Sequence, residues 1–359
     1  MKAAVLHKTH DPIQIDDVTL DNPASSEVIV RTMAAGVCHS DLHLVEGLIT
    51  APLPCLLGHE SAGIVEEVGS GVTDFKAGDH VIACLSIFCG KCERCLSGRP
   101  NVCLNRPVRD SADTPRVTLN GERVEQFANI GGYAEQMLLH ENTLVKIDKD
   151  VSFEVAALIG CGVTTGVGAV LNTAKVEAGS SVAVFGVGGI GLSAIQGARI
   201  AGAIKIIAVD LAEHKLAKAM EVGATHVVDA SSHDPVEAVR DLTDGGVDYA
   251  FEAVGIKETS EQAYQATRGG GVCTIVGVLP EGVNIEIEGR SLLSEKRLQG
   301  SSMGSNRFRI DMPRYIEMYR QGNLMVNEII TRRGNLEDIN DLYAAQKNRE
   351  EARSVILFD

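Results

Sequence analysis

The second half of the chain alternates between strand-like and helix-like segments, and no other feature limits the fold as much. The strand-like runs are residues 181–186, 204–210, 225–230, 247–255 and 271–278, and the helix-like segments between them are residues 190–202, 212–223, 235–243 and 258–267. Parallel strands joined by crossover helices produce this order of elements. Residues 163–300 are therefore predicted to form an α/β domain with a doubly wound parallel sheet.

The first half has a different character and predicts a separate β domain. Residues 1–150 contain short strand-like runs that end in Gly-rich turns, for example residues 27–37 and 61–72. This pattern favours a barrel-like β domain. Residues 106–127 are polar and lack a pattern, so we expect a surface loop or insertion there. A chain of 359 residues is also long for a single core, which favours two domains.

The alternation loosens after about residue 300. A helix is expected near residues 311–321 and a strand at residues 354–358. We expect this tail to return to the β domain, so that residues 1–162 and 301–359 together form one domain.

The first strand of the α/β region leads directly into a glycine motif, Gly186-Val187-Gly188-Gly189-Ile190-Gly191, which opens a helix. In a dinucleotide site, Gly186 permits the tight turn, Gly188 lets the backbone approach the pyrophosphate, and Gly191 allows close helix–strand packing. The N–H groups at the start of the helix are donors for the phosphates. The motif therefore predicts a bound dinucleotide.

Asp210 closes the next strand and indicates which dinucleotide is bound. Its carboxylate is expected to accept hydrogen bonds from the adenosine ribose hydroxyls, and its charge repels a 2′-phosphate, so NAD is favoured over NADP. Lys215, one helical turn later, either helps to hold the ribose or is an ordinary solvated lysine.

Composition excludes several classes of partner. The formal net charge of −15 argues against binding to nucleic acid or to an anionic membrane. The polar, acidic N-terminus predicts neither a secretory signal nor a transit peptide, and no run of about 18 apolar residues is evident that would span a membrane. We therefore expect a cytoplasmic protein that acts on a small molecule.

Four cysteines stand in one short stretch: Cys89, Cys92, Cys95 and Cys103. Their spacing suits a closed tetrahedral zinc site, which has no vacant position and does no chemistry. In a chain without a secretory signal, cysteines at metal spacing favour reduced, metal-binding thiols over disulfides. This loop therefore predicts a structural zinc. The other three cysteines, Cys55, Cys84 and Cys273, are expected to be small buried residues.

A second set of zinc ligands is scattered along the chain. Cys38, His59 and Cys161 together offer two thiolates and one imidazole. Three such ligands make a catalytic zinc site whose fourth position is open to water or substrate. Singly, each has an ordinary alternative, a small core cysteine or a satisfied turn histidine. The four-cysteine loop and the dinucleotide motif in the same chain favour the metal site.

With these motifs in this order, the chain resembles the zinc-dependent alcohol dehydrogenases of the medium-chain dehydrogenase/reductase superfamily. The resemblance runs essentially end to end and rests on GHESAGIVEEVGSGVTDFKAGDHV, the four-cysteine loop, ALIGCGVTTG and VAVFGVGGIG. It implies a GroES-like β-barrel catalytic domain, a Rossmann coenzyme domain, and an active site in the cleft between them. It also implies NAD as cofactor and two zinc ions per subunit, one catalytic and one structural.

The resemblance assigns roles to matching positions. Cys38, His59 and Cys161 match the catalytic zinc ligands, and Glu60 matches an acid that transiently approaches the metal. Asp41 matches a carboxylate that orients the ligand histidine. Ser40 matches the hydroxyl that takes the substrate proton, and His43 the histidine that passes it to solvent through the nicotinamide ribose.

The implied cofactor contacts include Thr165 at the nicotinamide, and His39 and Arg353 at the pyrophosphate. Val276, Gly189 and Ile190 are assigned to the same cofactor site. His39 stands where many relatives have Arg, so its phosphate contact is expected to weaken above about pH 6.5, where His loses its charge.

The substrate is expected to be apolar. Ile49 and Leu85 fall where relatives line the substrate pocket, which favours hydrophobic primary alcohols and aldehydes, aliphatic or aromatic. Alternatively, both side chains simply fill the core.

Three other functions compete with this one. Relatives that are glutathione-dependent formaldehyde dehydrogenases carry an acid at the position of Ile49, and polyol dehydrogenases usually carry Glu at the position of Cys161. A non-catalytic protein that binds zinc and NAD is the alternative from another class. It is disfavoured because the zinc ligands and the Ser40–His43 relay are all present.

The length of the segment between the cysteine loop and Cys161 is closer to that of dimeric relatives than to that of tetrameric ones. A homodimer through the coenzyme domains is therefore expected, with a tetramer as the alternative.

Overall fold

In the computed structural model, which describes residues 1–348 and 352–359, the chain divides between Cys161 and Gly162 into two units. The first unit contains residues 1–161, 307–320 and 330–359, and the second contains residues 162–306 and 321–329. Two short segments of the tail, residues 301–306 and 321–329, thus belong to the second unit.

The first unit is organised around its longest strand, β4 (Glu27–Val37), which pairs with β6, β10 and β19. Because β19 pairs with β4, the C-terminal strand lies in the same sheet as strands from the first half of the chain. The sheet has seven strands, which are β4 and β6 (Ser61–Val68), β7 (His80–Ala83), β10 (Gln136–His140), β11 (Leu144–Ile147), β18 (Arg332–Gly334) and β19 (Ser354–Leu357).

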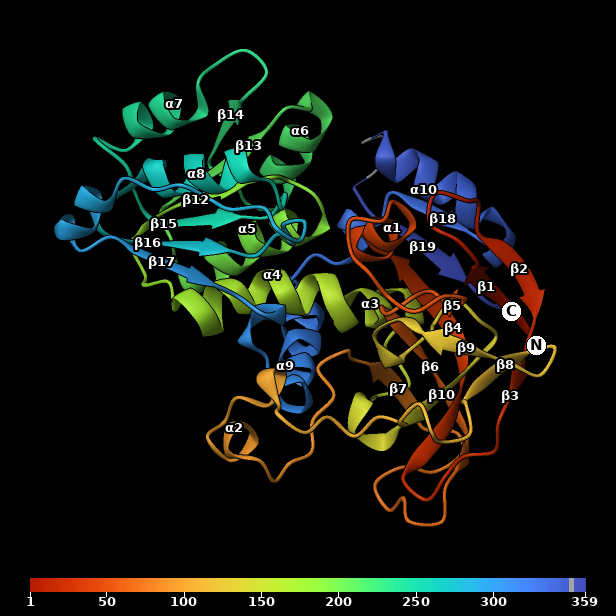
Figure 1. The fold of residues 1–359 in the computed structure, drawn as a ribbon. Coiled ribbons are helices and arrows are strands. Elements are labelled where there is room, and N and C mark those ends of the chain that lie inside the picture. Colours follow the sequence, from red (N-terminus) through yellow and green to blue (C-terminus); the bar gives the residue numbers. More distant parts are fainter. Residues whose placement is uncertain (349–351) are drawn as a thin grey trace. The chain divides into compact units, whose positions relative to one another are not determined.

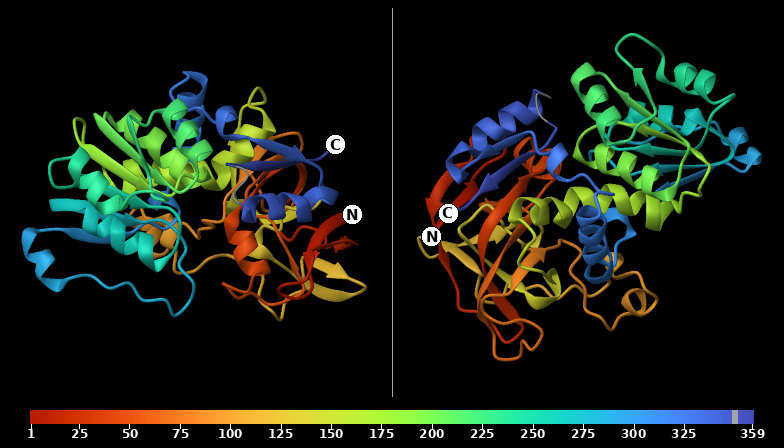
Figure 2. Two further views of the ribbon diagram at one scale, coloured as in Figure 1. Left: turned by 90° about the horizontal axis from the view of Figure 1, so that it is seen from above. Right: turned by 180° about the vertical axis from the view of Figure 1, so that it is seen from behind.

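A second sheet of six strands completes the β structure of this unit. Its order is β2-β1-β5-β9-β8-β3. The strands are β1 (Lys2–Leu6), β2 (Gln14–Asp17), β3 (Thr19–Leu20), β5 (Cys55–Leu56), β8 (Val117–Leu119) and β9 (Glu122–Gln126). Both chain termini lie in the first unit, close to one another (Figure 2).

The expectation of a patternless loop at residues 106–127 was wrong, because β8 and β9 form an antiparallel hairpin there. The two-residue turn is Asn120-Gly121, and both residues have positive φ, 53° and 86°. Asn-Gly is the sequence that a tight hairpin turn of this kind prefers, because both of its central residues need positive φ. The turn signal was therefore present in the sequence, although the strands beside it are short and polar.

The helices of the first unit are mostly short. They are α1 (His39–Val45), α2 (Glu93–Leu96), α3 (Phe153–Leu158), α9 (Phe308–Arg320) and α10 (Ile339–Lys347). Helix α9 begins three residues before the expected position, and β19 begins at the expected residue.

The second unit contains a parallel sheet in the order β14-β13-β12-β15-β16-β17, which confirms the predicted doubly wound fold (Figure 1). The strands are β12 (Ser181–Phe185), β13 (Lys205–Asp210), β14 (His226–Asp229), β15 (Val247–Glu252), β16 (Thr267–Ile275) and β17 (Arg297–Gly300). The chain runs from β12 outward on one side and from β15 outward on the other, so the order reverses between these two strands. Ligands of such sheets bind at the carboxyl ends of the strands beside this reversal.

The helices of the second unit are α4 (Thr164–Gly168), α5 (Gly189–Ala201), α6 (Glu213–Val222), α7 (Pro235–Leu242) and α8 (Lys257–Ala266). Right-handed crossovers place the helices before and after the reversal on opposite faces of the sheet. Helix α4 packs so tightly on α5 that a Cβ at Gly166 would lie 2.4 Å from the carbonyl oxygen of Ile190.

One helical stretch, Phe153–Ala174, is long and apolar enough to cross a membrane by length and composition alone, with a mean hydropathy of 1.7. The expectation that the chain has no apolar run of about 18 residues was therefore wrong for this stretch. However, 89% of its apolar window is buried within the protein, as expected for a core helix.

Candidate metal and dinucleotide sites

Cys38, His59 and Cys161 converge in the first unit. Cys38 immediately precedes α1, His59 lies between β5 and β6, and Cys161 lies on a π-helical turn, Ile159–Val163. Their ligand atoms all lie within 4.8 Å of one another, and all three residues are buried. π-Helical turns inside α-helices frequently occur at functional sites.

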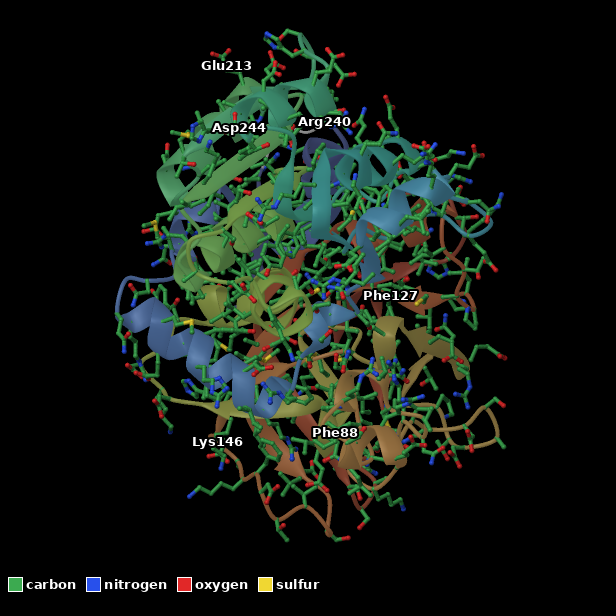
Figure 3. The ribbon with its side chains drawn as sticks, turned by 90° about the vertical axis from the view of Figure 1, so that its left-hand side faces the viewer. Phe88, Phe127, Lys146, Glu213, Arg240 and Asp244 are labelled. Carbon is green, nitrogen blue, oxygen red and sulfur yellow. The ribbon has the colours of Figure 1, made fainter. Side chains whose placement is uncertain are left out.

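The imidazole of His59 has one nitrogen facing the thiols and the other facing a carboxylate. Its Nε2 lies 3.4 Å from Sγ of Cys161, and its Nδ1 lies 2.9 Å from Oδ2 of Asp41. The other oxygen of Asp41 accepts the N–H of Gly58 at 2.8 Å. The ring of Phe127, labelled in Figure 3, meets the imidazole edge-on with centroids 5.5 Å apart. A carboxylate at Nδ1 leaves Nε2 as the free ligand nitrogen.

The three residues affect one another's ionisation. The pKa of the Cys38 thiol is held well below its ordinary value, chiefly by a hydrogen bond with Cys161 and also by the charges of His59 and Arg353. Burial alone would lower the pKa of His59, but the charges of Asp41 and Cys38 outweigh it and raise that pKa. Two thiols and one imidazole at this separation fit a zinc ion with an open fourth position.

Glu60 lies next to this cluster and forms a buried ion pair with Arg353. Its side chain packs against the backbone of Gly36, where an added Cβ would lie 2.7 Å from Cδ of Glu60. Burial raises the pKa of Glu60 to about 7, in spite of the opposing charge of Arg353. Arg353 was assigned to the cofactor pyrophosphate. Its side chain is 5% exposed and pairs with Glu60.

Helix α1 carries the three remaining residues of the expected proton relay and phosphate contact. The Oγ of Ser40 lies 3.9 Å from Sγ of Cys38. The rings of His39 and His43 lie on successive turns, with centroids 6.3 Å apart, and His39 is exposed. Ile49 and Leu85, the expected pocket residues, are partly buried and pack against two different core clusters of the first unit.

Cys89, Cys92, Cys95 and Cys103 form a second cluster whose four sulfur atoms lie within 4.8 Å of one another. Cys92 precedes the short helix α2, and backbone N–H groups of Cys95 and Leu104 lower the pKa of its thiol to about 6. Four thiols in one loop fit a closed zinc site. All nine cysteines are free of disulfides, and Cys55, Cys84 and Cys273 are buried.

The four-cysteine loop is held to the body of the first unit beside Phe88, which Figure 3 labels. The ring of Phe308 meets the Phe88 ring edge-on at 5.6 Å, and the guanidinium of Arg309 lies 5.3 Å from its centre. Arg309 also donates to the carbonyl oxygens of Glu141 and Leu144. Helix α9 therefore anchors Phe88, which directly precedes Cys89.

The glycine motif of the second unit has an open face. Gly186 has a φ of +88°, and an added Cβ there would lie 2.4 Å from Cγ2 of Val254. A Cβ at Gly191 would lie 1.9 Å from the carbonyl oxygen of Gly186, whereas a Cβ at Gly188 would meet nothing within 4 Å. The turn is thus closed on its protein side and open beside Gly188 and the N-terminus of α5, as a pyrophosphate requires.

Asp210 is fixed beside this turn. Its Oδ2 accepts the N–H of Val187 at 2.7 Å, and its Oδ1 accepts the N–H groups of Leu211 and Ala212 at 2.8 and 3.1 Å. Lys215 is 8% exposed, which does not fit the alternative of a solvated lysine.

Two further expected cofactor contacts lie elsewhere in the second unit. Thr165 donates its hydroxyl to Sδ of Met303 at 3.2 Å. Val276 is largely buried beyond the end of β16, and its N–H donates to the carbonyl oxygen of Glu252.

Sequence reasoning missed the residues that support these clusters. Tyr133 and Phe127 pack around His59 and Asp41, and Glu252 is fully buried at the carboxyl end of β15. The carboxylate of Glu252 accepts the N–H groups of Val254 and Gly255 and the hydroxyl of Thr259. Nothing in the spacing of these residues points to a site.

Comparison with known families accounts for both units. The model of the alcohol dehydrogenase GroES-like domain matches residues 24–149, and the model of the zinc-binding dehydrogenase domain matches residues 189–320. Together they cover well over half of the chain.

Individual proteins resemble the chain over almost its full length. A class-3 alcohol dehydrogenase of Zea mays is 38% identical over 95% of this chain and 92% of its own. A benzyl alcohol dehydrogenase of Acinetobacter calcoaceticus has 33% identity and a TM-score of 0.94 over 100% of this chain and 99% of its own. A zinc-binding dehydrogenase of Sinorhizobium meliloti, solved with NADP, has 30% identity and a TM-score of 0.85 over 99% of both chains.

Proposed function

Because the chain belongs to the zinc-dependent alcohol dehydrogenases of the medium-chain dehydrogenase/reductase superfamily, we propose that it catalyses the reversible NAD-linked oxidation of hydrophobic primary alcohols to aldehydes. The observation that carries the proposal is the convergence of Cys38, His59 and Cys161, whose ligand atoms lie within 4.8 Å of one another. The proposed complement is two zinc ions per subunit, with the second in the four-cysteine loop. The same chemistry would oxidise secondary alcohols to ketones.

The protein's part in the reaction is to bind, orient and move a proton. A zinc ion held by Cys38, His59 and Cys161 would act as a Lewis acid on an alcohol or a carbonyl oxygen. Ser40 is proposed to take the hydroxyl proton of the substrate and His43 to pass it to solvent, and the 3.9 Å between Oγ of Ser40 and Sγ of Cys38 supports this role for Ser40. Asp41 holds the ligand histidine in the tautomer that leaves Nε2 free.

The cofactor would be held by the second unit. The coenzyme, when bound, would accept a hydride as NAD⁺ or supply one as NADH. The open face at Gly188 and the N-terminus of α5 support a pyrophosphate contact, together with Gly186, Gly189, Ile190 and Gly191. The fixed carboxylate of Asp210 supports a ribose contact and favours NAD over NADP. Thr165, Lys215, Val276, His39 and Arg353 are proposed as further contacts.

Apolar side chains at Ile49 and Leu85 favour hydrophobic substrates, and an aromatic alcohol is the first to test because a structural relative is a benzyl alcohol dehydrogenase. The second candidate is glutathione-dependent formaldehyde oxidation, raised by the class-3 alcohol dehydrogenase among the relatives. Ile49 argues against it, because relatives of that kind carry an acid at this position.

The decisive experiment follows NADH formation with a panel of aliphatic and aromatic alcohols, with formaldehyde with and without glutathione, and with NADP replacing NAD. Zinc content is measured on the same sample. We expect turnover of hydrophobic alcohols with NAD. Activity with formaldehyde that rises sharply with glutathione would favour the second candidate, and normal turnover by zinc-free protein would refute the mechanism.

We also propose a cytoplasmic location and a homodimeric assembly. Nine cysteines without a disulfide suit the reducing cytoplasm. A homodimer is proposed from the length of the segment before Cys161, and light scattering that gave a tetramer would refute it.

A further inference from the structure

Tyr133 is fully buried and contacts the segments on both sides of Cys38. Its hydroxyl donates to the carbonyl oxygen of Gly36 at 2.9 Å and lies 3.4 Å from Oδ2 of Asp41. Gly36 is near the end of β4 and Asp41 is in the first turn of α1. One hydroxyl thus joins the strand that leads into Cys38 to the helix that follows it.

Tyr133 also fixes the backbone that leads into His59. Its N–H donates to the carbonyl oxygen of Leu57 at 3.0 Å. Its ring lies so close to Gly58 that an added Cβ there would be 2.6 Å from Cδ1 of Tyr133, and Gly58 has a φ of +92°. The N–H of Gly58 donates in turn to Asp41. Glycine is therefore required immediately before the ligand histidine, because the Tyr133 ring leaves no space for a Cβ and because φ at this position is positive.

The contacts of Tyr133 near Cys38 and those near His59 meet at the carboxylate of Asp41. Asp41 is 0% exposed, and one of its carboxylate oxygens accepts the N–H of Gly58. The other oxygen lies near both Nδ1 of His59 and the hydroxyl of Tyr133. A carboxylate in this position sets the direction of the histidine ring. A group that constrains the carboxylate therefore constrains the ring as well.

We propose that the Tyr133 hydroxyl is a positioning residue for the metal site formed by Cys38, His59 and Cys161. It holds the turn at Cys38 and the carboxylate of Asp41 so that thiol and imidazole converge before a metal arrives. The inference rests on the proposed function, because it requires a metal at these three residues. The hydroxyl touches neither metal nor substrate, so its effect is expected on metal retention first and on turnover second.

The test is the release of metal to a chelator from purified zinc-loaded protein. Tyr133→Phe keeps the ring that packs on Gly58 and removes only the hydroxyl. Loss of a group that orients a metal ligand typically weakens metal affinity 10–100-fold, so we expect release about 10-fold faster from the three-residue site. The four-cysteine loop should keep its metal at the wild-type rate, and Cys38→Ser protein identifies which phase of release belongs to that loop.

Tyr264→Phe is the matched control. Tyr264 is 2% exposed in the second unit, and its hydroxyl lies 2.7 Å from Oγ of Ser291, so the variant also removes one buried hydroxyl without touching the three-residue site. General loss of packing would lower the melting temperature of both variants, whereas only Tyr133→Phe should change metal release. Cobalt substituted at the three-residue site should show a shifted visible spectrum in Tyr133→Phe and an unchanged one in Tyr264→Phe.

A double variant tests whether the Tyr133 hydroxyl acts through Asp41. In Asp41→Asn protein the further change Tyr133→Phe should have a much smaller effect on metal release. Wild-type release and an unshifted cobalt spectrum in Tyr133→Phe would overturn this inference while the proposed function stood. Wild-type protein that binds no metal at the three-residue site would overturn both.

Discussion

Arg116 donates its Nε hydrogen to Oε1 of Glu27 at 2.8 Å, across 89 residues of chain, and both side chains are buried. Arg109 reaches the same carboxylate from the same segment, with its Nε 3.0 Å from Oε1. These contacts tie the segment before the β8–β9 hairpin to the start of β4, the strand whose other end leads into Cys38.

The contacts of Glu27 predict that the stability of the fold decreases at acidic pH. The pKa of Glu27 is lowered to about 2, because hydrogen bonds from Arg109, Ala24 and Arg116 outweigh the opposing effect of burial. The unfolded value is about 4.3, so the stabilisation is complete above that pH and is lost as the pH falls towards 2. The shift corresponds to about 3 kcal/mol. We expect Glu27→Gln to lower the free energy of unfolding at pH 7 by at least about that amount, since it leaves the buried Arg116 unpaired.

Urea unfolding at pH 3 to 7 measures this, with the exposed Glu122→Gln in the same segment as the control. The difference between Glu27→Gln and wild type should shrink towards low pH. A difference that stays constant over this range would mean that the carboxylate charge does not stabilise the fold.

Cys38→Ser should abolish turnover, because the three-residue site loses one of its two thiols. The second unit is untouched, so NADH binding measured by fluorescence should persist. Cys55→Ser is the matched control, since Cys55 is equally buried and lies outside the cluster. Turnover at the wild-type rate in metal-depleted Cys38→Ser protein would refute the catalytic metal.

Cys95→Ala should first affect stability or assembly, because the four-cysteine site is closed and holds its loop together. Thermal unfolding should begin at a lower temperature, and residual folded protein should retain turnover. A variant that unfolds like the wild type and yet is inactive would contradict a structural role.

Asp210→Asn should change coenzyme preference. Removal of the charge relieves repulsion of a 2′-phosphate and weakens the hydrogen bonds to the ribose, each an effect of about 1.5–3 kcal/mol. We expect NAD affinity to fall about 10-fold and the ratio of NADP to NAD affinity to rise further. Asp229→Asn is the control, since Asp229 is the register partner of Asp210 on the neighbouring strand. An equal change of preference in both variants would remove Asp210 as the determinant.

The sequence predicted best those features whose physical cause is local. The glycine motif lies within six residues, and the strand–helix order that surrounds it reflects the burial of both faces of a parallel sheet. The four-cysteine loop is equally local. Cys38, His59 and Cys161 are distant from one another, and the other motifs of the chain together with the resemblance to a family indicated that they meet.

Features that depend on contacts between distant segments were not predicted. The pairing of Arg353 with Glu60, the two arginines on Glu27, and the contact of Tyr133 with Asp41 join segments that are 82 or more residues apart. No periodicity in the chain reflects such pairs. The hairpin at Asn120-Gly121 is different, because its turn signal was local and was outweighed by the polarity of its strands.

Cys161 ends the N-terminal segment of the first unit, so all three proposed metal ligands are encoded in one unit while the glycine motif and Asp210 are encoded in the other. A crossover between related genes at this junction would exchange the coenzyme module and leave the metal ligands intact. Coenzyme preference and metal chemistry can thus diversify separately in evolution, and chimeras joined at residues 161 and 162 offer the same freedom to the protein engineer.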